Sequence, residues 1–224
     1  MNTQTSLKIK VTVMLIVFFA LVFAAIFIPA QTLDYWSGWS YFAIFLIMTV
    51  IITFYFITVD PGLIERRTKP ETEKIQKVVQ SLNGLFFVLM LVIPGFDHHH
   101  HWSDVPKWLQ VAGNFSVLLG FTIVFIVFKQ NSYLANNIAA YNNQIVITTG
   151  FYAWVRHPMY SGAYLIILFT PLALGSFYGL LPALVISILI IIRTLNEEKI
   201  LARDLKGYQS YLEKIRYRFI PYII

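Results

Sequence analysis

The chain has 224 residues, of which 58% are hydrophobic and only 12% charged, and its formal net charge is +6. A typical soluble domain is about half apolar and about a quarter charged, so this composition excludes a water-soluble globular protein. The chain has no cysteine, which excludes disulfides, thiolate metal sites and a cysteine nucleophile.

The N-terminal region begins with two basic residues, Lys8 and Lys10, before a long apolar run. Signal peptides share this pattern, but residues 11–30 are long enough to span a membrane and further apolar regions follow, so we expect a first transmembrane helix. Three more charge-free regions cover residues 35–59, 78–96 and 108–128. Each fits one crossing of a hydrocarbon core about 30 Å thick.

A fifth charge-free region, residues 158–192, is too long for one crossing. As a single helix it would be about 52 Å long at ~1.5 Å per residue. The run Gly175-Ser176-Phe177-Tyr178-Gly179 interrupts it near its middle and is typical of a turn. We therefore expect a tight helical hairpin of two short spans, and about six transmembrane helices in all.

The distribution of positive charge supports six spans. Of the 17 Lys and Arg residues, all but Lys107 fall on the N-terminus, the 60–77 loop, the 129–157 loop or the region after Ile192. Positive residues are enriched in cytoplasmic loops, so we expect both termini on the cytoplasmic side. Membrane lipid phosphates are sufficient to explain the net charge, and we expect no nucleic-acid partner.

The predicted fold is an all-α, polytopic membrane helical bundle in a single domain, residues 1–224. Residues 1–128 form four N-terminal spans, and residues 129–224 form a core with the 158–192 hairpin and a cytoplasmic tail. The 60–77 loop mixes charges of both signs and is interpreted as a solvated connector. After Ile192, apolar residues recur at three- and four-residue spacing, which predicts an amphipathic C-terminal helix; they are Leu201, Leu205, Tyr208 and Leu212.

The run Arg156-His157-Pro158-Met159-Tyr160-Ser161-Gly162 lies at the cytoplasmic end of the hairpin. Pro158 suits the first turn of a helix, which places Arg156 and His157 just outside its N-terminus. Free backbone N–H groups there attract an anion, and Gly162 leaves room for a ligand near the backbone. The alternative is an interfacial arginine and tyrosine that anchor an ordinary helix end.

Arg193, Glu197 and Glu198 form a second charged group at the end of the sixth span. Arg193 and Glu197 share one helix face, so they can form a local ion pair. They can instead bind a ligand, the carboxylates holding an ammonium and the arginine holding a carboxylate. Together the two groups present charges of both signs on one side of the hairpin, as a zwitterionic cofactor requires.

The sequence resembles the isoprenylcysteine carboxyl methyltransferase family, most closely its bacterial members. The resemblance covers residues 130–224 and is carried by Gly150 to Gly162 (GFYAWVRHPMYSG), 197–201 (EEKIL), 207–211 (GYQSY) and 216–221 (RYRFIP). It implies an integral membrane methyltransferase that uses S-adenosyl-L-methionine, with its active site facing the cytoplasm, in a bacterial inner membrane.

The resemblance also implies roles for individual residues. It implies that His157, Tyr160 and Gly162 line the cofactor site and that Glu197 and Glu198 face the amino group of the cofactor. The full set of expected cofactor-binding residues is Arg156, His157, Pro158, Tyr160, Gly162, Glu197, Glu198 and Tyr208. The resemblance further implies that Arg193 lies toward the acceptor. A thiol or amine acceptor would need a base, for which His157 is the nearest candidate, so Arg193 and His157 are the expected catalytic residues. No metal is required, because methyl transfer is a displacement at a sulfonium carbon.

The methyl acceptor is left open by the sequence. It is expected to be a lipophilic small molecule or a lipid-tailed one that enters from the membrane: a prenylcysteine carboxylate, or another thiol, amine or lipid. A membrane reductase of the sterol-reductase type and a small transporter are alternative functions. Transport is disfavoured because the first four spans contain no ionisable residues. The run His98 to His101 lies on the opposite side and is interpreted as an exposed polar loop.

Overall fold

The computed structural model describes residues 3–223 apart from 69, 72 and 135–143. The helices are α1 (Thr3–Ala30), α2 (Trp36–Val59), α3 (Pro61–Thr68), α4 (Lys74–His100), α5 (Lys107–Gln130), the 3-10 helix η1 (Gly150–Ala153), α6 (Pro158–Ala173), α7 (Leu180–Asp204) and α8 (Tyr208–Lys214). The described regular structure is entirely helical, which confirms the predicted all-α class.

Five helices, α1, α2, α4, α5 and α7, are long and apolar enough to cross a membrane, and the chain is a multi-pass membrane protein. The predicted hairpin is present as α6, a turn and α7. Its two arms are unequal. Helix α6 has 16 residues and is only ~24 Å long, whereas α7 has 25 residues and, at about 37 Å, extends beyond the hydrocarbon core. The expectation of two short arms is therefore wrong for α7.

Helix α6 packs most extensively against α5, and glycines permit the close approach. A Cβ atom placed on Gly120 would lie 2.6 Å from the carbonyl oxygen of Gly162. A Cβ atom on Gly162 would lie 2.7 Å from the carbonyl oxygen of Gly120. Small residues let helix backbones approach closely in membranes, where association depends on van der Waals packing. The two glycines therefore fix α6 against α5.

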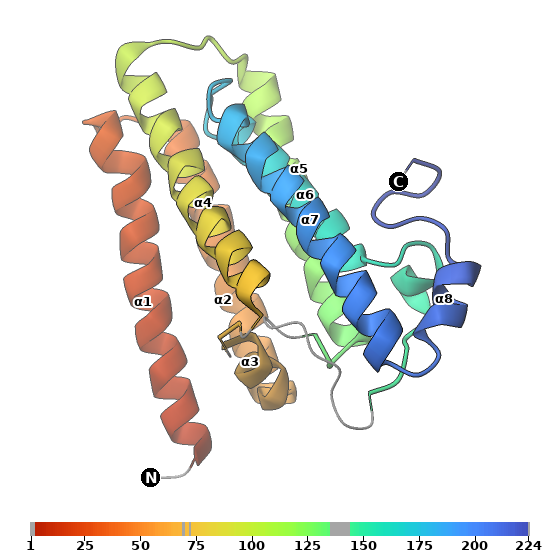
Figure 1. Ribbon diagram of the computed structural model, residues 1–224. Coiled ribbons are helices and arrows are strands. Elements are labelled where there is room, and N and C mark those ends of the chain that lie inside the picture. Colours follow the sequence, from red (N-terminus) through yellow and green to blue (C-terminus); the bar gives the residue numbers. More distant parts are fainter. Residues whose placement is uncertain (1–2, 69, 72, 135–143, 224) are drawn as a thin grey trace.

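The helices form a bundle with two distinct ends (Figure 1). The N-terminus, α3 and α8 lie at one end, and the turns that follow α1, α4 and α6 lie at the other. At that other end the hydroxyl of Tyr35 donates to the carbonyl of Leu174 (2.6 Å), and the backbone N–H of Phe177 donates to Ser103 Oγ (3.1 Å). These hydrogen bonds hold the hairpin turn against both neighbouring loops. The basic segments lie at the opposite end of the bundle.

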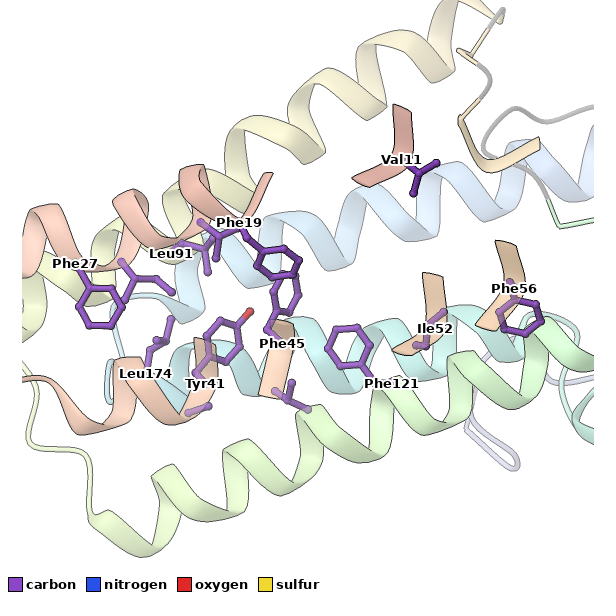
Figure 2. Packing of buried hydrophobic residues seen from close by; sticks show 14 of the residues in the cluster. Val11, Phe19, Phe27, Tyr41, Phe45, Ile52, Phe56, Leu91, Phe121 and Leu174 are labelled. Carbon is purple, nitrogen blue, oxygen red and sulfur yellow. The ribbon is translucent and has the colours of Figure 1, made fainter. Parts of the chain in front are cut away.

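Aromatic side chains fill the interior between α1, α2 and α5 (Figure 2). The ring of Phe45 packs edge-on against Phe19 and Phe121, with centroid separations of 5.7 and 5.5 Å. Lipid tails are as apolar as these side chains, so the rings stabilise the bundle through close packing and ring geometry, which is worth about 0.5–1.5 kcal/mol per pair.

The predicted amphipathic C-terminal helix is divided in the structure. Helix α7 continues to Asp204, and the chain then turns at Gly207, whose φ of +87° lies in the left-handed region that favours glycine. The short helix α8 follows. The apolar side chains still form one cluster, composed of Leu205, Tyr208, Tyr211 and Ile215, with Leu201 and Leu212 against it. The spacing therefore identified a common apolar cluster but not the break in the helix.

Candidate functional site

A cavity lies at the basic end of the bundle, where η1, the start of α6, the end of α7 and α8 come together. Its polar lining includes residues predicted from the sequence: Arg156, His157, Tyr160, Arg193, Glu197 and Tyr208. Residues 145–147 and the side chains of Met159, Leu201 and Leu205 contribute apolar lining. Two groups of charged residues that are about 40 positions apart in the chain thus share one cavity.

The C-terminal tail holds the start of α6 in position. The backbone N–H groups of Arg156 and His157 donate to the carbonyls of Tyr217 and Arg218, each over 2.9 Å. One turn into α6, the hydroxyl of Ser161 donates to the carbonyl of Phe219 (2.5 Å). Pro158 occupies the first helical position, as predicted, and is buried outside the cavity lining.

Glu198 is enclosed by three basic side chains. Its Oε1 atom lies 3.1 Å from Nε of Arg156 and 3.3 Å from Nε2 of His157, and its Oε2 atom accepts from Nε of Arg218 at 3.1 Å. The residue is buried and is absent from the cavity lining. Glu198 thus joins the tail to the start of α6, and its contact with a bound ligand stays a prediction.

Glu197, one residue earlier, does line the cavity. Nε of Arg193 donates to the hydroxyl of Tyr160 (3.1 Å), and that hydroxyl donates to Oε2 of Glu197 (3.0 Å). Arg193 and Glu197 share a helix face as predicted, and the phenol of Tyr160 connects them. These two hydrogen bonds fix the orientation of the Arg193 and Glu197 side chains within the cavity.

Two residues that the sequence did not identify also contact Arg193. Nη1 of Arg193 donates to Gln76 Oε1 (3.1 Å) and lies 3.5 Å from Glu71 Oε2. Gln76 is fully buried and Glu71 is buried. The described part of residues 60–77 is thus more than a solvated connector, because it includes helix α3 and because Glu71 and Gln76 contact the site. A mixed-charge segment looks the same in sequence whether water or protein surrounds it.

The cavity has a tyrosine wall formed by Tyr152, Tyr208 and Tyr211. Burial raises the pKa of all three phenols, so they remain neutral hydrogen-bonding groups at physiological pH. The hydroxyl of Tyr211 donates to the carbonyl of Tyr152 (2.8 Å). The buried hydroxyl of Tyr208 has no hydrogen-bond partner among the described residues. A buried hydroxyl without a partner is costly, so Tyr208 is suited to bind a ligand.

Gly162 does not lie on the cavity. It is buried against α5, where its contact with Gly120 leaves no space for a ligand. The predicted role of Gly162 in binding a ligand stays a prediction, and the contact that the structure shows is with α5. The close approach that its small size permits involves a neighbouring helix.

The histidine run lies at the other end of the bundle, on the last turn of α4. The ring of His98 stacks on Tyr35, with 4.1 Å between centroids, and His99 and His100 are exposed. Within the described part of the chain, no group of three or more metal-binding side chains is arranged to hold an ion.

Much of the part of the chain that builds the cavity also matches a known protein family. Residues 108–206 match the phospholipid methyltransferase family model. The match runs from α5 to the end of α7 and so includes Arg156, His157, Tyr160, Arg193 and Glu197. Phospholipid methyltransferases are membrane enzymes that use S-adenosylmethionine, and they are related to the isoprenylcysteine carboxyl methyltransferases. No curated protein matches the chain.

The match supports the coarser prediction of an S-adenosylmethionine-dependent membrane methyltransferase. It directs the expected acceptor toward lipids, and it does not single out carboxyl methylation. A nicotinamide-dependent reductase and a transporter gain no support from it.

Proposed function

We propose that the chain methylates the amine of a phospholipid head group, with S-adenosylmethionine as methyl donor. The observation that carries this proposal is the coincidence of the phospholipid methyltransferase match with the helices whose ends build the charged cavity. A lipid acceptor also explains why the cavity lies at the membrane boundary.

The cavity residues fit the polar groups of S-adenosylmethionine. Glu197 offers a carboxylate for its ammonium group, and Arg156 offers a guanidinium for its carboxylate. The unpartnered hydroxyl of Tyr208 is available to the ribose or the amino-acid part. Tyr160 holds Glu197 in place and presents an aromatic face near the sulfonium charge. Of the sequence-predicted set, Arg156, His157, Tyr160, Glu197 and Tyr208 stay proposed cofactor contacts, and Pro158, Gly162 and Glu198 act on the structure around them.

Bound S-adenosylmethionine supplies a sulfonium methyl group for in-line displacement. The amine lone pair forms the new N–C bond as the C–S bond breaks and its electron pair goes to sulfur. The amine must be neutral to attack, so a base is needed. The hydrogen bond from Nε2 of His157 to Glu198 leaves Nδ1 as the basic nitrogen, and His157 is the proposed proton acceptor. Arg193, held by Tyr160, Gln76 and Glu71, lies toward the acceptor.

We further propose that the cavity and both termini face the cytoplasm, in a bacterial inner membrane. The basic residues gather at the cavity end of the bundle, and Lys107 begins α5 at the opposite end.

A carboxylate acceptor, as in the isoprenylcysteine carboxyl methyltransferases, is the second candidate. The GFYAWVRHPMYSG motif supports it, and Arg193 is suited to orient a carboxylate. A carboxylate is already ionised at pH 7 and needs no base.

Transfer of radiolabelled methyl groups separates the two candidates. The purified protein is incubated with labelled S-adenosylmethionine and vesicles of phosphatidylcholine with or without phosphatidylethanolamine, or with a prenylcysteine. We expect label in the phospholipid only when phosphatidylethanolamine is present, at a rate reduced in His157→Gln. Label in the prenylcysteine alone would replace the amine acceptor with a carboxylate.

A further inference from the structure

Arg67, the penultimate residue of α3, lies outside the region that matches the methyltransferase family and was not identified from the sequence. Its guanidinium carbon lies 5.0 Å from the centre of the Phe128 ring at the end of α5. Its Nη1 atom lies 3.6 Å from the sulfur of Met159 on α6. The charged group is therefore inserted among apolar side chains at the boundary of the membrane-spanning helices.

Arg67 differs from the other arginines near the site in having no acidic partner. Arg66 lies 3.6 Å from Asp60, Arg193 lies 3.5 Å from Glu71, and Glu198 pairs with Arg156 and Arg218. No carboxylate of the described residues lies within 4.0 Å of the Arg67 guanidinium. None of the residues outside the described part is Asp or Glu. A half-buried cation among apolar side chains without a counterion is unfavourable, and a ligand that supplies the counterion would stabilise it.

The electrostatic surroundings of Arg67 connect it to the cavity. Burial lowers the pKa of its guanidinium, Arg193 lowers it further by repulsion, and Tyr160 and Glu197 partly offset both effects. Arginine remains protonated nonetheless. Met159, which contacts Arg67, also lines the cavity. One flexible side chain thus stands between the arginine and the proposed reaction site.

We propose that Arg67 binds the phosphodiester of the lipid acceptor. The inference rests on the proposed function, because it places the head-group amine in the cavity beside Arg193 and the phosphate two carbons away on the Arg67 side of Met159. The planar guanidinium can donate two parallel hydrogen bonds to a phosphate, and its stacking on Phe128 fixes its orientation. The N-terminal half of the chain then contributes acceptor specificity to a cavity built by the C-terminal half.

The test compares Arg67→Gln and Arg67→Lys with Arg66→Gln, which removes the same charge from the adjacent residue but from one that already has a carboxylate partner. Methyl transfer to phosphatidylethanolamine in phosphatidylcholine vesicles gives KM and kcat, and titration gives the affinity for S-adenosylmethionine. Loss of a charge-assisted hydrogen bond should raise KM for the phospholipid about 10- to 100-fold in Arg67→Gln. Arg67→Lys should lie between that variant and the wild type, and affinity for S-adenosylmethionine should be unchanged.

A binding measurement makes the test independent of turnover. Native mass spectrometry of the detergent-purified protein measures retained phosphatidylethanolamine, and competition by glycerophosphoethanolamine, ethanolamine or inorganic phosphate separates a head-group site from a free-phosphate site. We expect glycerophosphoethanolamine to compete best, and Arg67→Gln to lose both phospholipid retention and this preference.

The outcomes separate the proposed contact from the proposed function. Loss of phospholipid retention in Arg67→Gln without methyl transfer by the wild type supports the phosphate contact and removes the amine acceptor. If the wild type methylates phosphatidylethanolamine and Arg67→Gln has the same KM and phospholipid retention, the contact is overturned and the proposed function stands. The contact is also overturned if inorganic phosphate is the only competitor of the bound phospholipid, or if Arg66→Gln loses as much phospholipid retention as Arg67→Gln.

Discussion

The hydroxyl of Tyr160 donates a hydrogen bond to Oε2 of Glu197 over 3.0 Å, and it accepts one from Nε of Arg193 over 3.1 Å. The phenol thereby holds opposite charges apart at fixed positions within the proposed reaction site. An interaction of this kind orients two functional groups at once, so its loss should affect the reaction more than the fold.

Tyr160→Phe should lower kcat/KM about 10- to 100-fold, because removing a hydrogen bond to charged groups costs about 1.5–3 kcal/mol. The ring remains, so the packing of α6 is retained. Tyr164→Phe is the control, because its hydroxyl donates to the carbonyl of Ser187 away from the cavity. Equal activity of the two variants would contradict a role for the Tyr160 hydroxyl.

Tyr208→Phe and Tyr211→Phe form a matched pair. The Tyr208 hydroxyl has no partner among the residues described, so its removal should leave thermal stability unchanged and weaken S-adenosylmethionine binding severalfold. The Tyr211 hydroxyl donates to the Tyr152 carbonyl, so its removal should cost about 1 kcal/mol of stability. Melting temperature in detergent and calorimetric titration measure the two effects. Lower stability and unchanged S-adenosylmethionine affinity in Tyr208→Phe would contradict a role for Tyr208 in binding.

Glu198→Gln should loosen the C-terminal tail, because it removes a buried anion that three basic side chains share. Leaving buried charges without their counterion in this way commonly costs about 3 kcal/mol or more. Limited proteolysis should cleave the tail after Lys214, Arg216 or Arg218 faster in this variant. Asp204→Asn is the control, since Asp204 forms a solvent-exposed pair with Arg203 that contributes little. Equal proteolysis of the two variants would show that Glu198 does not hold the tail.

Gly120→Ala should destabilise the protein, because the added Cβ atom would lie 2.6 Å from the Gly162 carbonyl oxygen and would force α6 away from α5. A cost of about 1–3 kcal/mol is typical of such overpacking. Gly84→Ala is the control, because nothing lies within 4 Å of its Cβ position and alanine favours the helix by ~1 kcal/mol. Thermal unfolding in detergent should separate the variants in opposite directions.

The natural absence of cysteine allows a direct test of orientation. Glu213→Cys on α8 and Asp104→Cys in the loop before α5 place single exposed thiols at opposite ends of the bundle. In intact cells, a membrane-impermeant maleimide should label the variant at 104 and not the variant at 213. Labelling of the variant at 213 alone would place the cavity outside the cytoplasm.

The spans and the division of charge could be read from the sequence because each depends on local composition. Residues 158–192 had to turn, since a straight helix of that length exceeds the membrane, and the structure has the turn at Gly175–Gly179. The difference in length between α6 and α7 could not be predicted from local composition. Helix α7 ends at Asp204, where Leu205 turns extended before the left-handed turn at Gly207, and the last part of the helix packs in the cluster around Leu205 and Tyr208.

The sequence predicted only part of the candidate site, because the packing of the helices decides the rest. Glu197 and Glu198 are equivalent in sequence, yet successive residues on a helix point about 100° apart. Only the packing of α7 decides which carboxylate faces the cavity and which meets Arg218. Glu71, Gln76 and Arg67 come from a segment whose mixed charges resemble an exposed loop. The burial of Glu71 and Gln76 beside Arg193, and the contact of Arg67 with Met159, depend on the tertiary structure.

The most direct test is calorimetric titration of the detergent-purified protein with S-adenosylmethionine and, separately, S-adenosylhomocysteine. We predict micromolar binding of both ligands, weakened at least about tenfold in Glu197→Ala because a charge-assisted contact is lost. Glu213→Ala, which alters an exposed carboxylate on α8, should bind like the wild type. Absence of binding by folded wild-type protein, or equal affinity in Glu197→Ala, would contradict the proposed cofactor site.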